Sequence, residues 1–337
     1  MVAPERGCAD VGRVVVIGAG LIGAGWTTVF LAAGLHVTVS DPAPGAEDGL
    51  ARDVARRWPA VRRLGLTDAD HPPAPVFAAD LEGAVAAADW VQESVPDDER
   101  LKAEVMRRVD AVAGPDVIIA SSTSGIPPTR LQDGCGAQPG RVIVGHPSNP
   151  VHILPLVEVV GGRSTSADVI HRAMAFYEAV GKRPLHVRAE TPGFIANRLQ
   201  EAVNREVFHL VAEGVATCEE IDAAMSDGPG LRYAVQGPSC VYMLQGGAGG
   251  AARALRQFSP DRIADWSYNH YPEMTAEVIA AFDAQTREMS RGRSLEEWEQ
   301  ERDEFLIRAL QVRTALRQET RHAGAGPGDD GHGGVAG

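Results

Sequence analysis

The sequence predicts an α/β domain built on a parallel sheet, followed by an all-helical domain. In the first half of the chain, short runs of Val and Ile alternate with stretches of helical periodicity, the pattern of a parallel sheet with helical crossovers. A glycine-rich turn joins the first run to the first helical stretch. Beyond residue 190, apolar residues recur only at helical spacing.

The composition is that of a soluble globular protein and argues against several classes of partner. The 337 residues, 44% hydrophobic and 23% charged, leave room for two domains. The excess of 45 acidic over 32 basic residues argues against a nucleic-acid partner. No signal peptide or membrane span is recognisable, so we expect a cytoplasmic protein with no membrane partner. The four cysteines lack metal-ligand spacing, so we expect free thiols and no metal.

Seven strands and three helices are expected in the first domain. The strands are expected at residues 13–18, 36–41, 90–94, 116–122, 141–145, 156–160 and 183–188. The helices are expected at residues 22–34, 46–58 and 99–114. Most of the strands are short Val- or Ile-rich runs, as buried parallel strands require.

Helices dominate the second half of the chain. They are expected at residues 194–214, 217–225 and 294–317, the second opening with a capping box from Thr217 to Glu220. We therefore place an α/β domain at residues 1–190 and a helical domain at residues 191–320. The Gly-rich tail, residues 321–337, lacks apolar anchors and is predicted to be disordered.

The turn GAGLIG, residues 18–23, matches the GxGxxG pattern of dinucleotide-binding loops. The pattern alone is weak, since GPGDDG in the tail matches it too. Here, however, it follows a strand and opens a helix. Gly18 would allow the tight turn, Gly20 the approach of a pyrophosphate, and Gly23 close packing of helix on strand. The diphosphate would sit on the free N–H groups of the helix start, where Leu21 and Ile22 lie.

Asp41 ends the second expected strand, twenty-one residues after Gly20. In a Rossmann-type fold, a carboxylate at this position can accept hydrogen bonds from the adenosine ribose hydroxyls of the bound dinucleotide. Because Pro42 follows and not an Arg, the sequence favours NAD over NADP, whose 2′-phosphate would meet an anion. The alternative is a tight turn with a surface Asp.

His146 and Glu158 are the candidate proton-transfer pair. Hydride transfer from an alcohol to NAD needs a base, and His146 follows a strand at the carboxyl edge of the sheet, where α/β folds bind ligands. Glu158 is a lone carboxylate within an apolar run, which is costly without a partner. If the intervening turn folds back, Glu158 reaches one ring nitrogen. The alternative is a surface His and an edge-strand Glu.

Three motifs together resemble the 3-hydroxyacyl-CoA dehydrogenase superfamily: SSTSG (121–125), GHPSNP with LPLVEVV (145–160) and ETPGFIANRL (190–199). The resemblance covers nearly all of residues 13–320. It implies that His146 is the base and Glu158 its orienting partner. It also implies that Ser124 bonds the reacting oxygen and that Asn197 positions the substrate and the imidazole.

The resemblance implies further cofactor contacts after the strand at residues 90–94. Lys102 and Asp97 match the Lys and the acidic residue that the family places near the cofactor, and Glu93 lies just before them. Each assignment has a plain alternative. Ser124 would be a helix N-cap, Asn197 an exposed helix residue, and Lys102 a solvated charge.

The GHPxNP motif resembles the branch of the family that acts on small free acids, which includes L-gulonate 3-dehydrogenase, related to λ-crystallin, and L-carnitine dehydrogenase. This implies NAD-dependent oxidation of the 3-hydroxyl of a small polar acid. Arg232 would clamp the carboxylate, or else form a surface ion pair. Ser148 and Asn149 would line the substrate. Ser148 replaces a bulky apolar residue and His152 a Tyr common in that branch, which makes the site more polar and disfavours carnitine itself.

Two other functions stay open at this point. A 3-hydroxyacyl-CoA or acyl-carrier-protein substrate would remove the role of Arg232. A non-catalytic NAD(H)-binding protein of the crystallin kind would bind the cofactor without turnover. We also expect a homodimer, by resemblance and because the amphipathic helices of the second half offer more apolar face than one small domain needs.

Overall fold

The computed structural model describes residues 11–258 and 267–324, which form two compact units. The first unit runs to Arg198 and also takes in Asp303–Gln311 from the last helix. The second unit holds Leu199–Arg302 and the residues from Val312 onward. The two units are therefore not separated by a single cut near residue 190, because residues 303–311 belong to the first unit.

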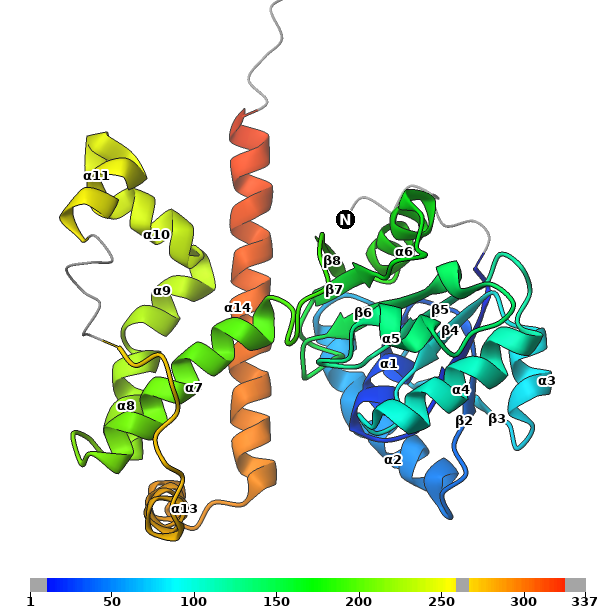
Figure 1. The fold of residues 1–337 in the computed structure, drawn as a ribbon, viewed down its shortest axis with the longest axis horizontal. Coiled ribbons are helices and arrows are strands. Elements are labelled where there is room, and N and C mark those ends of the chain that lie inside the picture. Colours follow the sequence, from blue (N-terminus) through cyan, green and yellow to red (C-terminus); the bar gives the residue numbers. More distant parts are fainter. Residues whose placement is uncertain (1–10, 259–266, 325–337) are drawn as a thin grey trace, which may run out of the picture. The chain divides into compact units, whose positions relative to one another are not determined.

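An eight-stranded sheet forms the centre of the first unit (Figure 1), with the strand order β3-β2-β1-β4-β5-β6-β7-β8. The strands are β1 Arg13–Ile17, β2 His36–Ser40, β3 Val76–Phe77, β4 Trp90–Glu93, β5 Ile118–Ser121, β6 Val142–Pro147, β7 Leu156–Gly161 and β8 Arg183–Val187. Seven of them lie where the sequence predicts strands. The short β3 was not predicted, because two residues give no pattern.

The sheet changes direction once, between β6 and β7. The strands from β3 to β6 are parallel, β7 is antiparallel to β6, and β8 is parallel to β7. Residues 148–155 join β6 to β7, and this connection is too short for a parallel crossover. The all-parallel sheet expected from the sequence is therefore corrected at its last two strands.

Helices cover both faces of the sheet. The helices are α1 Leu21–Ala32, α2 Ala46–Arg63, α3 Leu81–Ala86, α4 Glu99–Val112, α5 Pro128–Gln132 and α6 Ala167–Ala179. Val14 and Val16 of β1 pack into one core with α1, α2 and α6, whereas Val15 and Ile17 pack into a second core with α3, α4 and α5. Because side chains alternate along a strand, a strand buried on both faces reads as an unbroken apolar run.

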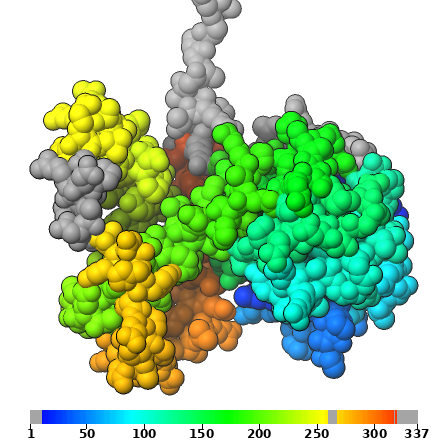
Figure 2. Space-filling view, in the orientation of Figure 1, coloured from blue at the N-terminus to red at the C-terminus, as the bar shows by residue number. Residues whose placement is uncertain are grey.

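The second unit is helical, as predicted. Its residues form all or part of α7 Ala196–Ala212, α8 Cys218–Ser226, α9 Pro229–Val235, α10 Pro238–Gln245, α11 Gly250–Gln257, α13 Ala276–Ser290 and α14 Leu295–Gly324. The capping box of Thr217 and Glu220 opens α8, which packs beside α13 (Figure 2). Helix α14 continues through Gly324 and so overlaps the first four residues of the tail that the sequence predicts to be disordered. The remainder of that tail lies outside the described residues.

Lys182 is a buried base between α6 and β8. Its Nζ donates to the backbone carbonyl oxygens of Val151 and Leu154 and lies 5.7 Å from the centre of the Trp26 ring. Burial lowers the pKa of Lys182 to about 7, from 10.5 for a solvated lysine. Between these two values the unfolded chain binds more protons than the folded chain. Stability therefore rises with pH in this window, and the contribution is lost as the pH falls to about 7.

We predict that this pH dependence disappears in Lys182→Met. The free energy of unfolding of the wild type should rise between pH 7.5 and 9.5 relative to that of the variant, by up to about 1.4 kcal/mol per pH unit. Urea denaturation of both proteins at several pH values measures the difference. Parallel pH profiles would show that Lys182 keeps its ordinary pKa.

Candidate active site

The glycine turn between β1 and α1 is packed as a dinucleotide loop requires. Gly18 has a φ of +96°, and a Cβ there would lie 2.7 Å from the carbonyl oxygen of Ser94. A Cβ on Gly23 would lie 1.8 Å from the carbonyl oxygen of Gly18. A Cβ on Gly20, by contrast, would meet nothing within 4 Å, which leaves room for a ligand against the backbone. These residues fit the phosphates of NAD at the N-terminus of α1, where Leu21 is exposed.

Asp41, just after β2, is hydrogen-bonded both to the glycine turn and to the turn that follows β2. Its Oδ2 accepts the N–H of Ala19 at 2.7 Å, and its Oδ1 accepts the N–H of Ala43 at 2.8 Å. Ile22 is half-buried and packs against the core under the turn. The carboxylate is thus held at the edge of the glycine turn, the position at which the sequence predicts a ribose contact.

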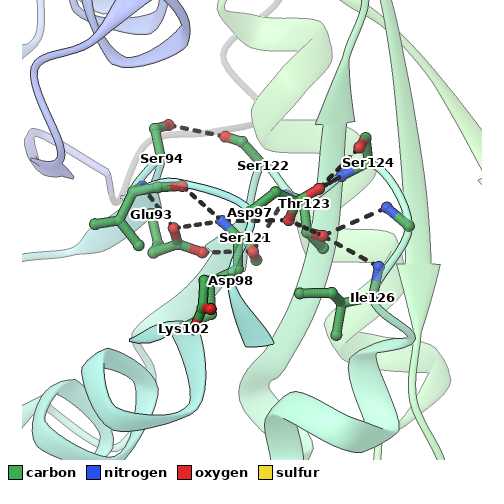
Figure 3. Close-up of polar contacts among 12 residues, drawn as sticks. Glu93, Ser94, Asp97, Asp98, Lys102, Ser121, Ser122, Thr123, Ser124 and Ile126 are labelled. Atoms are coloured by element: carbon green, nitrogen blue, oxygen red, sulfur yellow. Dashed lines mark hydrogen bonds and ion pairs between the residues drawn. The ribbon is translucent and has the colours of Figure 1, made fainter. Parts of the chain in front are cut away.

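Glu93 and Lys102 form a buried ion pair behind the end of β4 (Figure 3). Lys102 Nζ donates to Glu93 Oε1 at 2.7 Å, and Ser121 Oγ donates to Glu93 Oε2 at 2.5 Å. Burial raises the pKa of Glu93 in spite of the lysine beside it. Lys102 is 1% exposed, so its interpretation as a solvated charge is wrong. The pair also fixes the turn after β4, since both side chains contact Val95.

Asp97 accepts hydrogen bonds from two residues that follow β5 (Figure 3). Its Oδ1 accepts the Thr123 hydroxyl at 2.5 Å, while its Oδ2 accepts both the Ser124 hydroxyl at 2.8 Å and the Ser124 N–H at 3.1 Å. Burial raises the pKa of Asp97, but the hydrogen bonds from Thr123 and Ser124 outweigh it and the pKa is lowered. Ser124 is exposed and does not cap a helix, because Pro127 is the N-cap of α5.

His146 and Glu158 face each other across the antiparallel pair of β6 and β7. They are register partners, and His146 Nδ1 lies 2.8 Å from Glu158 Oε2. The side chains are 11% and 1% exposed, so the interpretation as a surface His is wrong. Burial raises the pKa of Glu158, but bonds from His146 and from the N–H groups of Ala196 and Ile195 outweigh it and the pKa is lowered. The carboxylate is therefore ionised at neutral pH.

The start of α7 is the third element of this arrangement. Glu158 Oε1 accepts the N–H groups of Ile195 at 2.8 Å and Ala196 at 3.0 Å. Phe194, just before them, has a φ of +48° and packs its buried ring 5.6 Å from the His146 ring. A left-handed conformation is costly for a phenylalanine and persists where surrounding contacts enforce it. The sequence signal for this turn, Gly193 before an aromatic residue, was not recognised.

Asn197 joins α7 to the turn after β5. Its Nδ2 donates to the backbone carbonyl oxygen of Ser124 at 3.3 Å. Asn197 is half-buried, so its interpretation as a freely exposed helix residue is wrong. The structure thus links the four predicted catalytic residues in one chain of contacts, from Ser124 through Asn197 and the first turn of α7 to Glu158 and His146.

The predicted substrate residues lie in two places. Ser148 is half-buried after β6 and donates its N–H to the carbonyl oxygen of Leu156 at 3.1 Å, and Asn149 beside it is exposed. Arg232 is exposed on α9 in the second unit, with its guanidinium 6.0 Å from the centre of the Tyr233 ring. Arg232 makes no ion pair among the described residues. Its contact with substrate stays a prediction.

Within residues 11–258 and 267–324, no group of three or more His, Cys, Asp or Glu side chains is arranged to hold a metal ion. None of the helices in the same residues is long and apolar enough to cross a membrane.

Known dehydrogenases are similar to this chain over most of its length. An L-carnitine dehydrogenase of Streptomyces coelicolor is 45% identical over 319 residues, covering 95% of this chain and 99% of the relative. An L-carnitine dehydrogenase of Pseudomonas aeruginosa is 45% identical, covering 89% of this chain and 94% of the relative. A solved structure of 5-formyl-3-hydroxy-2-methylpyridine 4-carboxylic acid (FHMPC) 5-dehydrogenase, an NAD+-dependent dismutase, is also similar. It matches with a TM-score of 0.77 and 29% identity, covering 91% of this chain and 99% of that one.

The family models match the two halves of the chain in order. Residues 13–191 match the model described as "3-hydroxyacyl-CoA dehydrogenase, NAD binding domain", and residues 193–281 match "3-hydroxyacyl-CoA dehydrogenase, C-terminal domain". The predictions of the family and of NAD as cofactor are confirmed. The chain belongs to the 3-hydroxyacyl-CoA dehydrogenase family of NAD-dependent oxidoreductases.

Proposed function

We propose that this enzyme oxidises the 3-hydroxyl of a small, polar free acid of the carnitine type to the 3-keto acid. Relatives named L-carnitine dehydrogenase, 45% identical over most of the chain, support this substrate class. The buried pair of His146 and Glu158 is the single observation that carries the chemistry. NAD, held at the glycine turn, supplies the hydride acceptor.

His146 acts as the base through Nε2. Because Nδ1 lies 2.8 Å from the ionised Glu158 carboxylate, Nδ1 carries the hydrogen and Nε2 keeps its lone pair for the substrate hydroxyl. The negative charge of Glu158 then stabilises the imidazolium that forms on proton transfer. Asn197 holds the first turn of α7 against the turn that contains Ser124. This contact keeps Glu158, which is bonded to the start of α7, at a fixed place relative to Ser124.

Ser124 contacts the reacting oxygen in this proposal. A hydroxyl has one hydrogen, and that of Ser124 is donated to Asp97. The single hydrogen of the substrate hydroxyl points at His146 Nε2, so Ser124 bonds the reacting oxygen only as a donor, after its own hydroxyl turns away from Asp97. Asp41, Asp97, Glu93 and Lys102 shape the cofactor side of the site.

The substrate side is polar. Ser148 and Asn149 follow His146 closely in the sequence and offer a hydroxyl and an amide. Arg232 has the planar guanidinium that suits a carboxylate. A serine at position 148 has little apolar surface for a trimethylammonium group. We therefore include acids that are richer in hydroxyl groups within the proposed class.

We also propose that the protein is a cytoplasmic homodimer. The second unit exposes many large apolar side chains, among them Leu231, Val235, Leu244 and Leu255. Apolar surface of this kind is typical of a subunit interface. The free thiols of Cys135, Cys218 and Cys240 fit a reducing compartment.

A substrate panel tests the proposed reaction. L-carnitine, L-gulonate, 3-hydroxybutyrate and 3-hydroxybutyryl-CoA are each mixed with enzyme and NAD, and NADH absorbance is followed. We expect saturable turnover of at least one free acid, and Arg232→Ala should raise its KM about tenfold. Turnover of the thioester alone would contradict the free-acid substrate, and NADH binding without any turnover would favour a non-catalytic protein.

Glu158→Gln should inactivate the enzyme while leaving its fold intact. The N–H groups of Ile195 and Ala196 will face the amide oxygen, so the amide N–H2 will face His146 Nδ1 and move the ring hydrogen to Nε2. We expect kcat to fall by about 10³-fold or more, since the base is then blocked. Glu220→Gln is the matched control, because glutamine also completes a capping box. Equal kcat in both variants would refute the role of Glu158.

Asp41→Asn should change the choice of dinucleotide. The amide still accepts a hydrogen bond but carries no charge, so NADH should bind about tenfold more weakly and NADPH more tightly. Fluorescence titration with both nucleotides measures the ratio. Asp48→Asn, which removes the same charge from the exposed start of α2, is the control. A ratio that does not move would place the ribose elsewhere.

A further inference from the structure

One buried side chain holds the loop that follows His146. Residues 148–155 join β6 to β7 and include Ser148 and Asn149. Lys182, which is 6% exposed, donates from Nζ to the carbonyl oxygen of Val151 and, at 3.1 Å, to that of Leu154. Two carbonyl groups of one turn therefore share one donor group, which comes from the turn between α6 and β8.

The same loop is packed closely on its other side. A Cβ added to Gly25 of α1 would lie 2.7 Å from the Cβ of Val151, so the loop touches the helix backbone. Within the loop, the N–H of Leu154 donates to the carbonyl oxygen of Pro150 at 2.8 Å. The loop thus lies between α1 and Lys182, and movement of the Lys182 head group moves Val151 and Leu154 with it.

Lys182 also contacts the second loop of the site through Trp26. Its Nζ lies 5.7 Å from the centre of the Trp26 ring, and Trp26 Nε1 donates to Ser122 Oγ at 3.1 Å. Ser122 stands two residues before Ser124. Among the described residues, Lys182 pairs with no carboxylate. A buried amine without a counter-charge costs stability, so a role in folding alone explains its presence poorly.

We propose that Lys182 is a positioning residue for substrate binding, which sets the place of Ser148 and Asn149 by holding the loop at residues 148–155. The proposal rests on the function proposed above. The neutral amine and the ammonium each have enough hydrogens for both carbonyl groups, so the contact survives loss of the charge. Lys182 touches neither substrate nor cofactor and acts through the loop.

Lys182→Met keeps the length and the apolar stem but removes the donor. We expect the KM for L-carnitine, or for the best acid of the panel, to rise about tenfold or more. We expect kcat to change less than about threefold and the Kd of NADH to stay the same, because the glycine turn is not held by Lys182. Amide hydrogen exchange at residues 151–154 and 156 should become faster.

Arg141→Met is the matched control. Arg141 is a buried cation in the other core of the same unit, where it donates to the carbonyl oxygens of Ala113 and Gly114 and also pairs with Asp110. Its loss should lower the Tm without raising the KM or the exchange rate of the loop. A KM that rises equally in both variants, or in neither, would overturn the role of Lys182.

The two proposals fail in different ways. If the wild type turns over none of the acids, the proposed function fails, and hydrogen exchange in Lys182→Met still decides whether Lys182 fixes the loop. If the wild type is active and exchange at residues 151–154 and 156 is unchanged in the variant, the function stands and the positioning role is wrong.

Discussion

The buried carboxylate of Glu158 is the contact on which the rest of the site depends. It is 1% exposed, and its two oxygens accept hydrogen bonds from His146 of β6 and from the first N–H groups of α7. One side chain thus joins the last strands of the sheet to the helix that leads into the second unit. Without these donors, an ionised group at this position would be prohibitively costly.

The path of the chain supplies those donors. The turn at residues 148–155 is short enough to reverse the strand, and the reversal puts His146 and Glu158 directly opposite each other. The strained turn at Phe194 then aims the N–H groups of Ile195 and Ala196 at the carboxylate. The antiparallel β7 departs from the parallel order of β3 to β6, and Phe194 departs from the usual backbone conformation of its residue type. Both serve the same carboxylate.

Much of the site is predictable because its parts lie in short motifs. The glycine turn is recognisable because a strand directly precedes it and a helix directly follows it. Glu158 is recognisable as a lone charge in an apolar strand. Lys182 and the bond between Asp97 and Ser124 are different. Each depends on loops that are distant in sequence and meet only in the folded sheet, so no local spacing reveals them. The short β3 and the return of Asp303–Gln311 to the first unit depend on tertiary packing in the same way.

The central claim is that Glu158 fixes the tautomer of His146. Long-range ¹H–¹⁵N NMR of histidine-labelled protein, assigned with His146→Gln, reports which ring nitrogen carries the hydrogen. At a pH where the ring is neutral, the account predicts a hydrogen on Nδ1 and an unprotonated Nε2 in the wild type. A hydrogen on Nε2 would contradict it, because His146 would then have no lone pair to take the substrate proton.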